Sequence, residues 1–314
     1  AGRRTQNEKT LHADLILAVG GGSTIDCSKA ISVSAWCEGD PWQRYWINYE
    51  PVSNKVVPVA AILTMAGTGS EMNGGSVITH EETMLKQGRV FPSFVNPRFS
   101  ILNPELTFTV PRLQMASGIF DTLSHLMEQY FSGEDDNTTD YVIEGVMASL
   151  IKSARAALLD PKDYEARSNI MWCATLGLNT LTGLSKIQDW EVHMIEHQVG
   201  AFTDCVHGLG LAAIACTYYR HIYDASVAAL FQFGRFATNV WGVSPEGKTA
   251  VQLAKAGIDA LDAWTREVGA YRTLSELGVT EDMLDPIADS IVCLPSNLKV
   301  LDRDEVRAIL AESM

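Results

Sequence analysis

DWEVHMIEHQVGAFTDCVHGLGLAA, residues 189–213, contains three of the seven histidines of the chain, His193, His197 and His207. His193 and His197 are four residues apart, so on a helix they lie on one face, one turn apart. His207 follows a short polar, glycine-containing break at which a second helix can start. Imidazole is a common ligand of zinc and other first-row divalent metals. We therefore expect a metal site, the plain alternative being buried, hydrogen-bonded histidines.

A second pair with helical spacing lies upstream in GIFDTLSHLMEQY, residues 118–130. Asp121 and His125 share one face of a helix that can begin at Pro111 and extend to about Phe131. The plain alternative is a helix ion pair, which is worth about 0.2–0.5 kcal/mol. A carboxylate beside an imidazole supports the metal interpretation.

Further helical patterns follow this segment to the end of the chain. They cover about 141–159, 165–184, 226–241, 247–265 and 302–312, and Asp160-Pro161 and Ser244-Pro245 separate them. No clear strand is present after residue 111. Residues 111–314 are therefore predicted to form an all-helical domain, joined by a linker over 103–111 to an α/β domain formed by residues 1–110.

The α/β domain contains a glycine loop between a strand and a helix. Residues 1–14 look like the end of a helix, Leu15–Val19 predicts a buried strand, and Gly20–Gly22 follows at once before a helix over 24–34. Free backbone N–H groups and the helix dipole at such a junction bind phosphate. The alternative is a tight turn with no ligand, since the loop is not G-x-G-x-x-G. Ser23 and Asp26 predict a capping pair at the helix start.

A second unit repeats this arrangement. Val56–Leu63 predicts a strand, and the loop TMAGTGS, residues 64–70, follows it. In an open parallel sheet both loops lie at the carboxyl edge, where ligands bind. Lys86, in a polar stretch beyond, could reach a ribose or phosphate oxygen, although a solvated loop lysine is the plainer interpretation.

Composition excludes several classes of partner. The formal net charge of −14 argues against nucleic-acid and anionic-membrane surfaces, and no apolar run approaches the roughly 18 residues of a membrane span. The six cysteines are scattered without a C-x-x-C, which predicts free thiols in a reducing compartment, the cytoplasm. We find no signal peptide, although a chain that starts at Ala1 can lack its true N-terminus.

Taken together and in this order, the motifs resemble the iron-containing (group III) alcohol dehydrogenases. They are LAVGGGSTID-x-x-K, T-x-x-GTGSE, NPELTFTVP, D-x-x-x-H, and DW-x-x-H-x-x-x-H with a later HG. The resemblance covers nearly the whole chain, and within the family it is closest to the branch of butanol dehydrogenases and broad-range aldehyde reductases.

The resemblance implies a Rossmann-like NAD(P)-binding α/β domain followed by a helical metal-binding domain, the dehydroquinate synthase-like superfold, with the active site between them. It implies hydride transfer between NAD(P)(H) and a short- to medium-chain primary alcohol or aldehyde. His197 matches a histidine that does not bind the metal but lies near the nicotinamide and the proton path. Its pKa, expected near neutrality, suits a relay. The implied metal ligands are Asp121, His125, His193 and His207, and the implied cofactor contacts are Gly21, Gly22, Ser23, Thr64, Thr68, Ser70, Asn73 and Lys86.

Members of the family carry further βα units before the segment that starts here at Ala1, so we expect the α/β domain to be truncated at its N-terminus. The missing part normally helps to decide between NAD and NADP, and we expect NADP(H) rather than NAD(H). Three imidazoles and a carboxylate suit Fe(II), and equally zinc, manganese or cobalt. The resemblance also suggests a homodimer.

Three other interpretations remain at this point. His193-Met-Ile-Glu196-His197 spells H-x-x-E-H, the inverted zincin motif, in which both histidines bind zinc and Glu196 is the base of a peptidase. A truncated remnant could bind metal without turnover. A glycerol dehydrogenase or a dehydroquinate-type synthase would share the superfold, but the DW-x-x-H spacing and GGGSTID favour the alcohol dehydrogenases.

Overall fold

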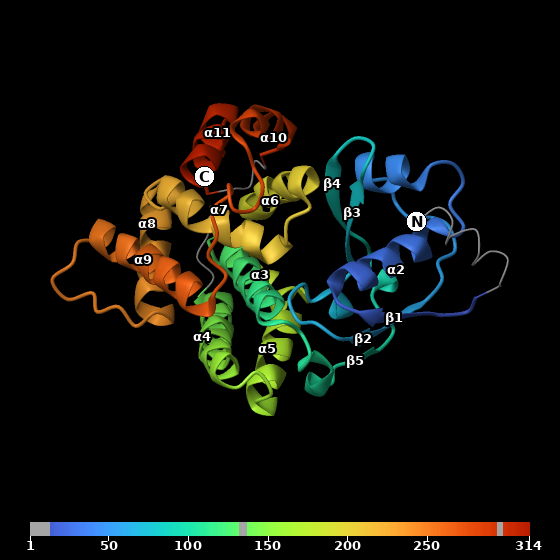
Figure 1. The fold of residues 1–314 in the computed structure, drawn as a ribbon, viewed down its shortest axis with the longest axis horizontal. Coiled ribbons are helices and arrows are strands. Elements are labelled where there is room, and N and C mark those ends of the chain that lie inside the picture. Colours follow the sequence, from blue (N-terminus) through green and yellow to red (C-terminus); the bar gives the residue numbers. More distant parts are fainter. Residues whose placement is uncertain (1–12, 132–136, 294–297) are drawn as a thin grey trace.

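The computed structural model describes residues 13–131, 137–293 and 298–314. Most of the helix end expected over residues 1–14 lies outside these residues. Strands gather at one end of the molecule and helices at the other (Figure 1). No helix among the described residues is long and apolar enough to span a membrane.

A three-stranded parallel sheet forms the centre of the α/β half, in the order β1 (Ile16–Gly20), β2 (Val59–Leu63) and β5 (Ser100–Ile101). Ile16 pairs with Val59 and Gly20 with Leu63, so the two glycine loops leave the sheet side by side. Helix α2 (Gly22–Ser34) contacts β1 and β2, and its Ile25 packs with Ala18 and Val59. β2 is a buried strand, as its small and β-branched residues suggest. The prediction of a buried strand over Leu15–Val19 is wrong, because β1 lies at the edge of the described sheet and only Ala18 of that stretch is buried.

The predicted capping pair at the start of α2 is wrong. The helix begins at Gly22, and its N-cap Gly21 has no side chain to cap it. Asp26 instead points into the core, where it accepts hydrogen bonds from Ser70 Oγ at 2.5 Å and from the backbone N–H of Val77 at 2.9 Å. Tertiary partners therefore override the local capping pattern.

An antiparallel hairpin, β3 (Gly75–His80) and β4 (Leu85–Val90), occupies the stretch that the sequence showed only as polar. It packs against α2 and against a helix of the other half, α6 (Glu191–Thr203) (Figure 1). A π-helical turn, Trp42–Ile47, covers it with Tyr45 and Trp46, which pack against Phe91.

The second half contains helices and no strand among its described residues. Their bounds are α3 (Arg112–Tyr130), α4 (Asn137–Leu159), α5 (Tyr164–Gly177), α6, α7 (His207–Ile222), α8 (Val227–Arg235), α9 (Ala250–Val268), α10 (Leu284–Ser290) and α11 (Arg303–Glu312). The continuous helix predicted over 165–184 is wrong at its end, because Thr180 takes a left-handed backbone and only a short 3₁₀ turn, Leu181–Gly183, follows. Helix α10 is an additional element.

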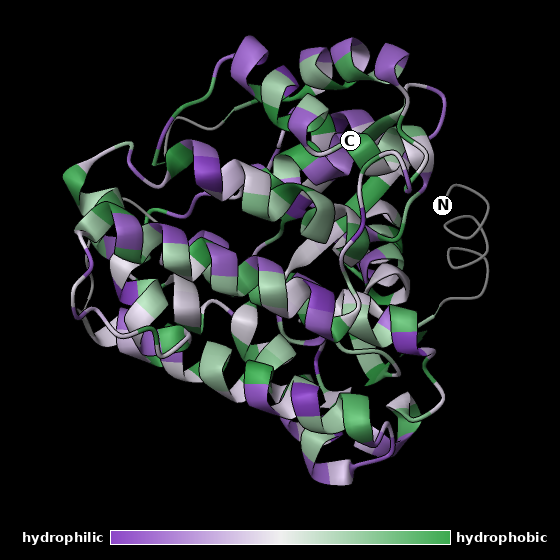
Figure 2. Ribbon diagram, turned by 60° about the vertical axis from the view of Figure 1, so that its left-hand side comes forward, coloured by the Kyte–Doolittle hydropathy of each residue, from purple (hydrophilic) through white to green (hydrophobic). Residues whose placement is uncertain are grey.

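Helix α3 is the central helix of this half. From Met115 to Tyr130 every residue is buried, and α3 packs against α4, α5 and α7. The outer helices carry hydrophilic and hydrophobic residues in alternation (Figure 2). On α9, Ile258, Leu261 and Trp264 recur at helical spacing and face the core. The rigid centre thus holds the polar side chains of α3 in place.

Candidate metal and cofactor site

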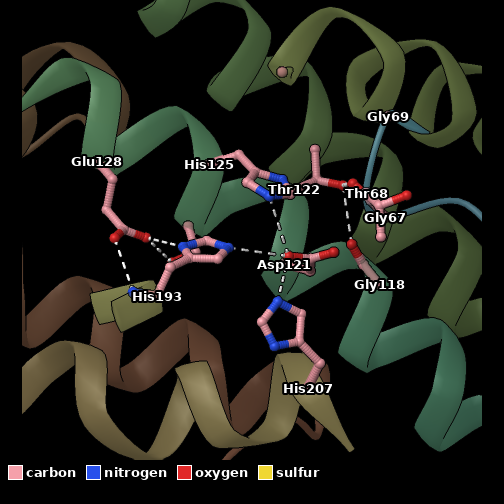
Figure 3. Close-up of polar contacts among 12 residues, drawn as sticks. Gly67, Thr68, Gly69, Gly118, Asp121, Thr122, His125, Glu128, His193 and His207 are labelled. Carbon is pink, nitrogen blue, oxygen red and sulfur yellow. Dashed lines mark hydrogen bonds and ion pairs between the residues drawn. The ribbon is translucent and has the colours of Figure 1, made fainter. Parts of the chain in front are cut away.

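Four side chains from three helices meet at one point, as Figure 3 shows. Asp121 and His125 extend from one face of α3, His193 from α6, and His207 from the first position of α7. The Nε2 atoms of the three histidines lie 3.5, 3.6 and 3.6 Å from the same atom, Asp121 Oδ1. The structure therefore brings together all four residues expected to bind a metal.

The donors in this cluster fit a divalent cation. Asp121 Oδ1 and His193 Nε2 are buried and have no hydrogen-bond partner. Leaving such atoms unpaired costs about 1–3 kcal/mol each, so a native structure needs a reason for them. Three imidazole nitrogens and one carboxylate oxygen are a donor set that suits Fe(II), Zn(II), Mn(II) or Co(II). A bound cation would give both unpaired atoms a partner.

Two carboxylates orient the ligand histidines from behind. His193 Nδ1 lies 2.5 Å from Glu128 Oε1, and Glu128 Oε2 also accepts the backbone N–H of His193 at 3.0 Å. His207 Nδ1 contacts Glu196 Oε2. With Nδ1 engaged, each ring presents Nε2 to the cluster. Sequence reasoning missed the role of Glu128, although it lies seven residues after Asp121 and so shares its helix face.

Burial and mutual charge set the protonation of the cluster. Burial raises the pKa of Asp121, but the imidazoles of His125, His207 and His193 outweigh it and hold the pKa well below its usual range. Burial lowers the pKa of His125 to about 4, so this ring is neutral and has a free lone pair. For His193, the carboxylates of Glu128 and Asp121 overcome burial and raise the pKa to about 10, so a bound cation must displace a proton there.

His197 lies beside the cluster and is not among the histidines that pair with Asp121. Its ring centroid is 5.7 Å from that of His207 and 6.1 Å from that of His193, at 89° to the latter. Burial, followed by the charge of Lys86, holds the pKa of His197 well below its ordinary value, so the expected near-neutral pKa is wrong. The ring is therefore neutral at neutral pH.

The second glycine loop reaches the metal cluster through a close backbone contact. A Cβ on Gly118 of α3 would lie 2.0 Å from the carbonyl oxygen of Ala66, and one on Gly67 would lie 3.1 Å from Asp121 Oδ2. Thr122 Oγ1 donates to the carbonyl of Gly67 at 3.3 Å (Figure 3). Glycine at these positions therefore brings the loop and the metal ligands together.

The first glycine loop lies next to the second. A Cβ on Gly22 would lie 2.3 Å from the side chain of Thr68, and one on Gly21 would lie 3.3 Å from Met65 Cβ. Ser23 is exposed, and Thr64 donates its backbone N–H to Gly20 at 3.0 Å. The uncapped start of α2, next to Thr68, is a fitting place for phosphate.

Ser70 and Asn73, two further candidate cofactor contacts, have buried side chains with internal partners. Lys29, fully buried, donates to Ser70 Oγ at 2.8 Å and to Asn73 Oδ1 at 3.2 Å. The pKa of Lys29 is lowered to about 8 by burial, against the attraction of Asp26. This network holds the loops to the hairpin. Lys86, the last candidate, forms an ion pair at 3.1 Å with Glu196 of α6.

Glu196 does not have the surroundings of a peptidase base. Its Oε2 is shared by Lys86 Nζ and His207 Nδ1, and the rings of His193 and His197 are perpendicular.

A separate cavity of about 420 Å³ lies between α4, α8 and α9, lined by Tyr141, Phe231 and Leu253, and contains no candidate site residue.

Comparison with known proteins identifies the family of the chain. Residues 4–104 match the model of the iron-containing alcohol dehydrogenases, and residues 115–314 match that of the C-terminal part of the Fe-containing alcohol dehydrogenase family. NADH-dependent butanol dehydrogenase A of Clostridium acetobutylicum is 37% identical over 282 residues, which are 90% of this chain and 71% of that protein. The NADPH-dependent aldehyde reductase YqhD of Escherichia coli is 34% identical over 84% of this chain and 67% of that protein.

A solved structure, NADH-dependent butanol dehydrogenase A from Thermotoga maritima, superposes with a TM-score of 0.92 at 33% identity, over 99% of this chain and 79% of that one. These matches overturn the peptidase interpretation and decide against the glycerol dehydrogenase and synthase alternatives. An α/β half followed by a helical half is the architecture shared with these relatives. The chain belongs to the iron-containing alcohol dehydrogenase family.

Proposed function

We propose that this enzyme transfers hydride between NAD(P)(H) and a short- to medium-chain primary alcohol or aldehyde. The observation that carries the proposal is the convergence of three imidazole Nε2 atoms on Asp121 Oδ1, next to a glycine loop that follows a parallel strand. The named relatives, butanol dehydrogenases and an aldehyde reductase, support the same reaction.

Four residues would hold the metal: Asp121, His125, His193 and His207. Glu128 and Glu196 accept from the Nδ1 atoms of His193 and His207, which keeps the Nε2 lone pairs directed inward. When bound, the ion polarises the substrate oxygen as a Lewis acid and the nicotinamide gives or takes the hydride. Burial of Asp121, His125 and His193 strengthens each of these electrostatic contacts.

The two glycine loops would hold the dinucleotide. Gly21, Gly22 and Ser23 offer backbone N–H groups at the start of α2 for the pyrophosphate. Thr64 and Thr68 lie on the facing loop. Ser70 and Asn73 hold this loop in place through their hydrogen bonds with the buried Lys29. Lys86 adds a cation at the edge of the site.

His197 would move the proton to or from the substrate oxygen. Its ring is buried, neutral and next to His207. A neutral imidazole can accept a proton when an alcohol is oxidised and return it when an aldehyde is reduced.

Finer assignments are also proposals. We propose iron as the ion, with zinc or another divalent metal as the alternative, and NADP(H) as the preferred cofactor, although the two butanol dehydrogenases named above are NADH-dependent. We propose a homodimer, a domain boundary near residue 110 between β5 and α3, and a cytoplasmic location, supported by six free cysteines.

The test is a metal analysis combined with an aldehyde panel assayed with NADH and with NADPH. We expect one ion per chain and metal-dependent oxidation of reduced cofactor. One tightly held ion without turnover on any aldehyde would instead support the non-catalytic remnant.

A further inference from the structure

The hairpin of the α/β half packs against α6, the helix that carries His193 and His197. Gln198 of α6 donates through Nε2 to the carbonyl of Lys86 at 3.3 Å. A Cβ on Gly88 would lie 3.5 Å from Cε1 of His197. β4 and α6 are therefore in direct contact along several residues (Figure 1).

Glu196 lies where this contact meets the metal cluster. Its side chain has no exposed surface, and one oxygen, Oε2, receives both Lys86 Nζ at 3.1 Å and His207 Nδ1. A buried carboxylate needs compensating partners, because loss of hydration is costly. Lys86, whose side chain is 17% exposed, supplies the cation.

His207 depends on such support more than the other ligands do. Its side chain is 30% exposed, whereas those of His125 and His193 are 6% and 7% exposed. It also occupies the first position of α7, at the end of the helix and not in its interior. The hydrogen bond from Nδ1 to Glu196 fixes both the tautomer and the ring direction.

We propose that Glu196 is a positioning residue that links Lys86 of the hairpin to the metal ligand His207, so that the affinity for the metal depends on a charge in the nucleotide-binding half. The inference rests on the proposed function in that His207 is taken as a ligand. Glu196, His197 and His207 also offer three donor atoms within 4.8 Å of one another. A second cation there would face the ammonium of Lys86, so we assign the carboxylate to positioning.

The experiment measures the Kd of Zn²⁺ for the metal-free full chain, without any nucleotide, by competition with a chromophoric chelator. Glu196→Gln should weaken binding by about 10–100-fold, as loss of a partner behind a ligand typically does. Lys86→Met should also weaken Zn²⁺ binding, whereas Lys86→Arg should bind Zn²⁺ as the wild type does, because arginine retains the positive charge. The double variant should bind no more weakly than Glu196→Gln alone, because both residues act through one oxygen.

The matched control is Glu144→Gln. Glu144 is also a buried carboxylate, bonded to Tyr130 and Arg235, and touches no metal ligand. It should bind Zn²⁺ as the wild type does. If Glu196→Gln fails to fold by circular dichroism, the Lys86→Met and Lys86→Arg pair carries the test.

A wild-type Kd for Lys86→Met would overturn the link, since no nucleotide is present and a purely cofactor-binding lysine would have no effect. Two Zn²⁺ ions per wild-type chain would overturn it as well. A chain that shows the expected order of Kd values but reduces no aldehyde would refute the proposed function and leave this inference standing.

Discussion

His193 is the ligand whose removal tests the metal assignment most directly. We expect His193→Ala to lose stoichiometric metal, because it removes one of the donors around Asp121 Oδ1 and leaves Glu128 without its imidazole partner. His221→Ala is the control, since that histidine pairs with Glu312 on the surface. Metal content by mass spectrometry decides, and one ion held with wild-type affinity by His193→Ala would refute the ligand set.

His197 should behave differently from the ligands. We expect His197→Ala to keep one metal ion per chain but to lose rate by about 10²–10⁴-fold, which is typical of a lost acid–base group. The reason is that its ring lies beside His207 and is neutral. Metal analysis and steady-state rates are measured on the same sample. Loss of the ion together with the activity would make His197 a ligand.

The candidate ligands could be predicted from sequence, whereas the carboxylates that bind the Nδ1 atoms of His193 and His207 could not. Spacings of four residues are enough to place Asp121 with His125, and His193 with His197, on shared helix faces. The role of Glu128 depends on α3 and α6 packing side by side, and that of Glu196 on the start of α7. Such partners depend on tertiary contacts that no local spacing contains.

At the scale of elements, the contact between α3 and the second glycine loop should be intolerant of a methyl group. Helix propensity alone favours alanine over glycine by about 1 kcal/mol. A Cβ on Gly118, however, would lie 2.0 Å from the carbonyl oxygen of Ala66, which is backbone and has little freedom to move. We expect Gly118→Ala to lower stability by about 1–3 kcal/mol and to weaken NAD(P)H binding.

Gly145→Ala on α4 is the matched control for Gly118→Ala, because nothing lies within 4 Å of its added Cβ. It should leave cofactor binding unchanged and keep or raise stability. Urea unfolding and fluorescence titration of NADPH measure both quantities. Equal behaviour of the two variants would mean that the close approach has no role.

Asp189, a buried acid just before α6, has a titration that can be measured through its effect on stability. Asp189 accepts the backbone N–H of Glu191 at 2.9 Å and the hydroxyl of Tyr218 at 3.0 Å. Burial raises its pKa from 3.8 to about 7. Between these values the folded chain holds a proton that the unfolded chain releases, so this contribution to stability is present below about pH 4 and is lost as pH rises to about 7.

Asp189→Asn cannot titrate, and its amide oxygen can still accept from the backbone N–H of Glu191 and from the hydroxyl of Tyr218, which both contact Oδ1 in the wild type. Relative to this variant, the metal-free wild type should lose stability between about pH 4 and pH 8, by up to about 4 kcal/mol for a shift of this size. Urea unfolding of both proteins across this range measures the difference. A difference that does not change with pH would show that Asp189 stays ionised.

The order of elements could be predicted from sequence more completely than their contacts. Strand Leu15–Val19 and the helices after Pro111 follow from apolar periodicity, and the structure confirms most of them to within a few residues, although the helix predicted over 165–184 ends at Gly177 and α10 is not among those predicted. The hairpin Gly75–Val90 could not, because its strands are short and half-buried, so their pattern is weak. The spacing of Ser23 and Asp26 predicts a helix cap. The actual partners of Asp26, Ser70 and Val77, are distant in sequence, so no local pattern indicates them.

At the scale of the whole molecule, one face of the sheet stands out among the described residues. Leu17 and Val19 of β1 are 49% and 57% exposed, Leu15 just before the strand is 44% exposed, and Ile101 of β5 is 47% exposed. Among these described residues β1 is also an edge strand of the sheet. An apolar face that adjoins an edge strand favours association between chains.

We therefore expect a protein made of these residues to associate as its concentration rises, beyond any dimer, and the double variant Leu17→Thr/Val19→Thr to associate less. Threonine keeps strand propensity, so the register with β2 should survive the change. Val227→Thr is the control, because that valine is 88% exposed and lies on α8, away from the sheet. Light scattering over a concentration series measures the mass, and zinc content reports that the helical half is intact. If the double variant and Val227→Thr gave the same mass as the wild type at every concentration, the β1 face would have no part in association.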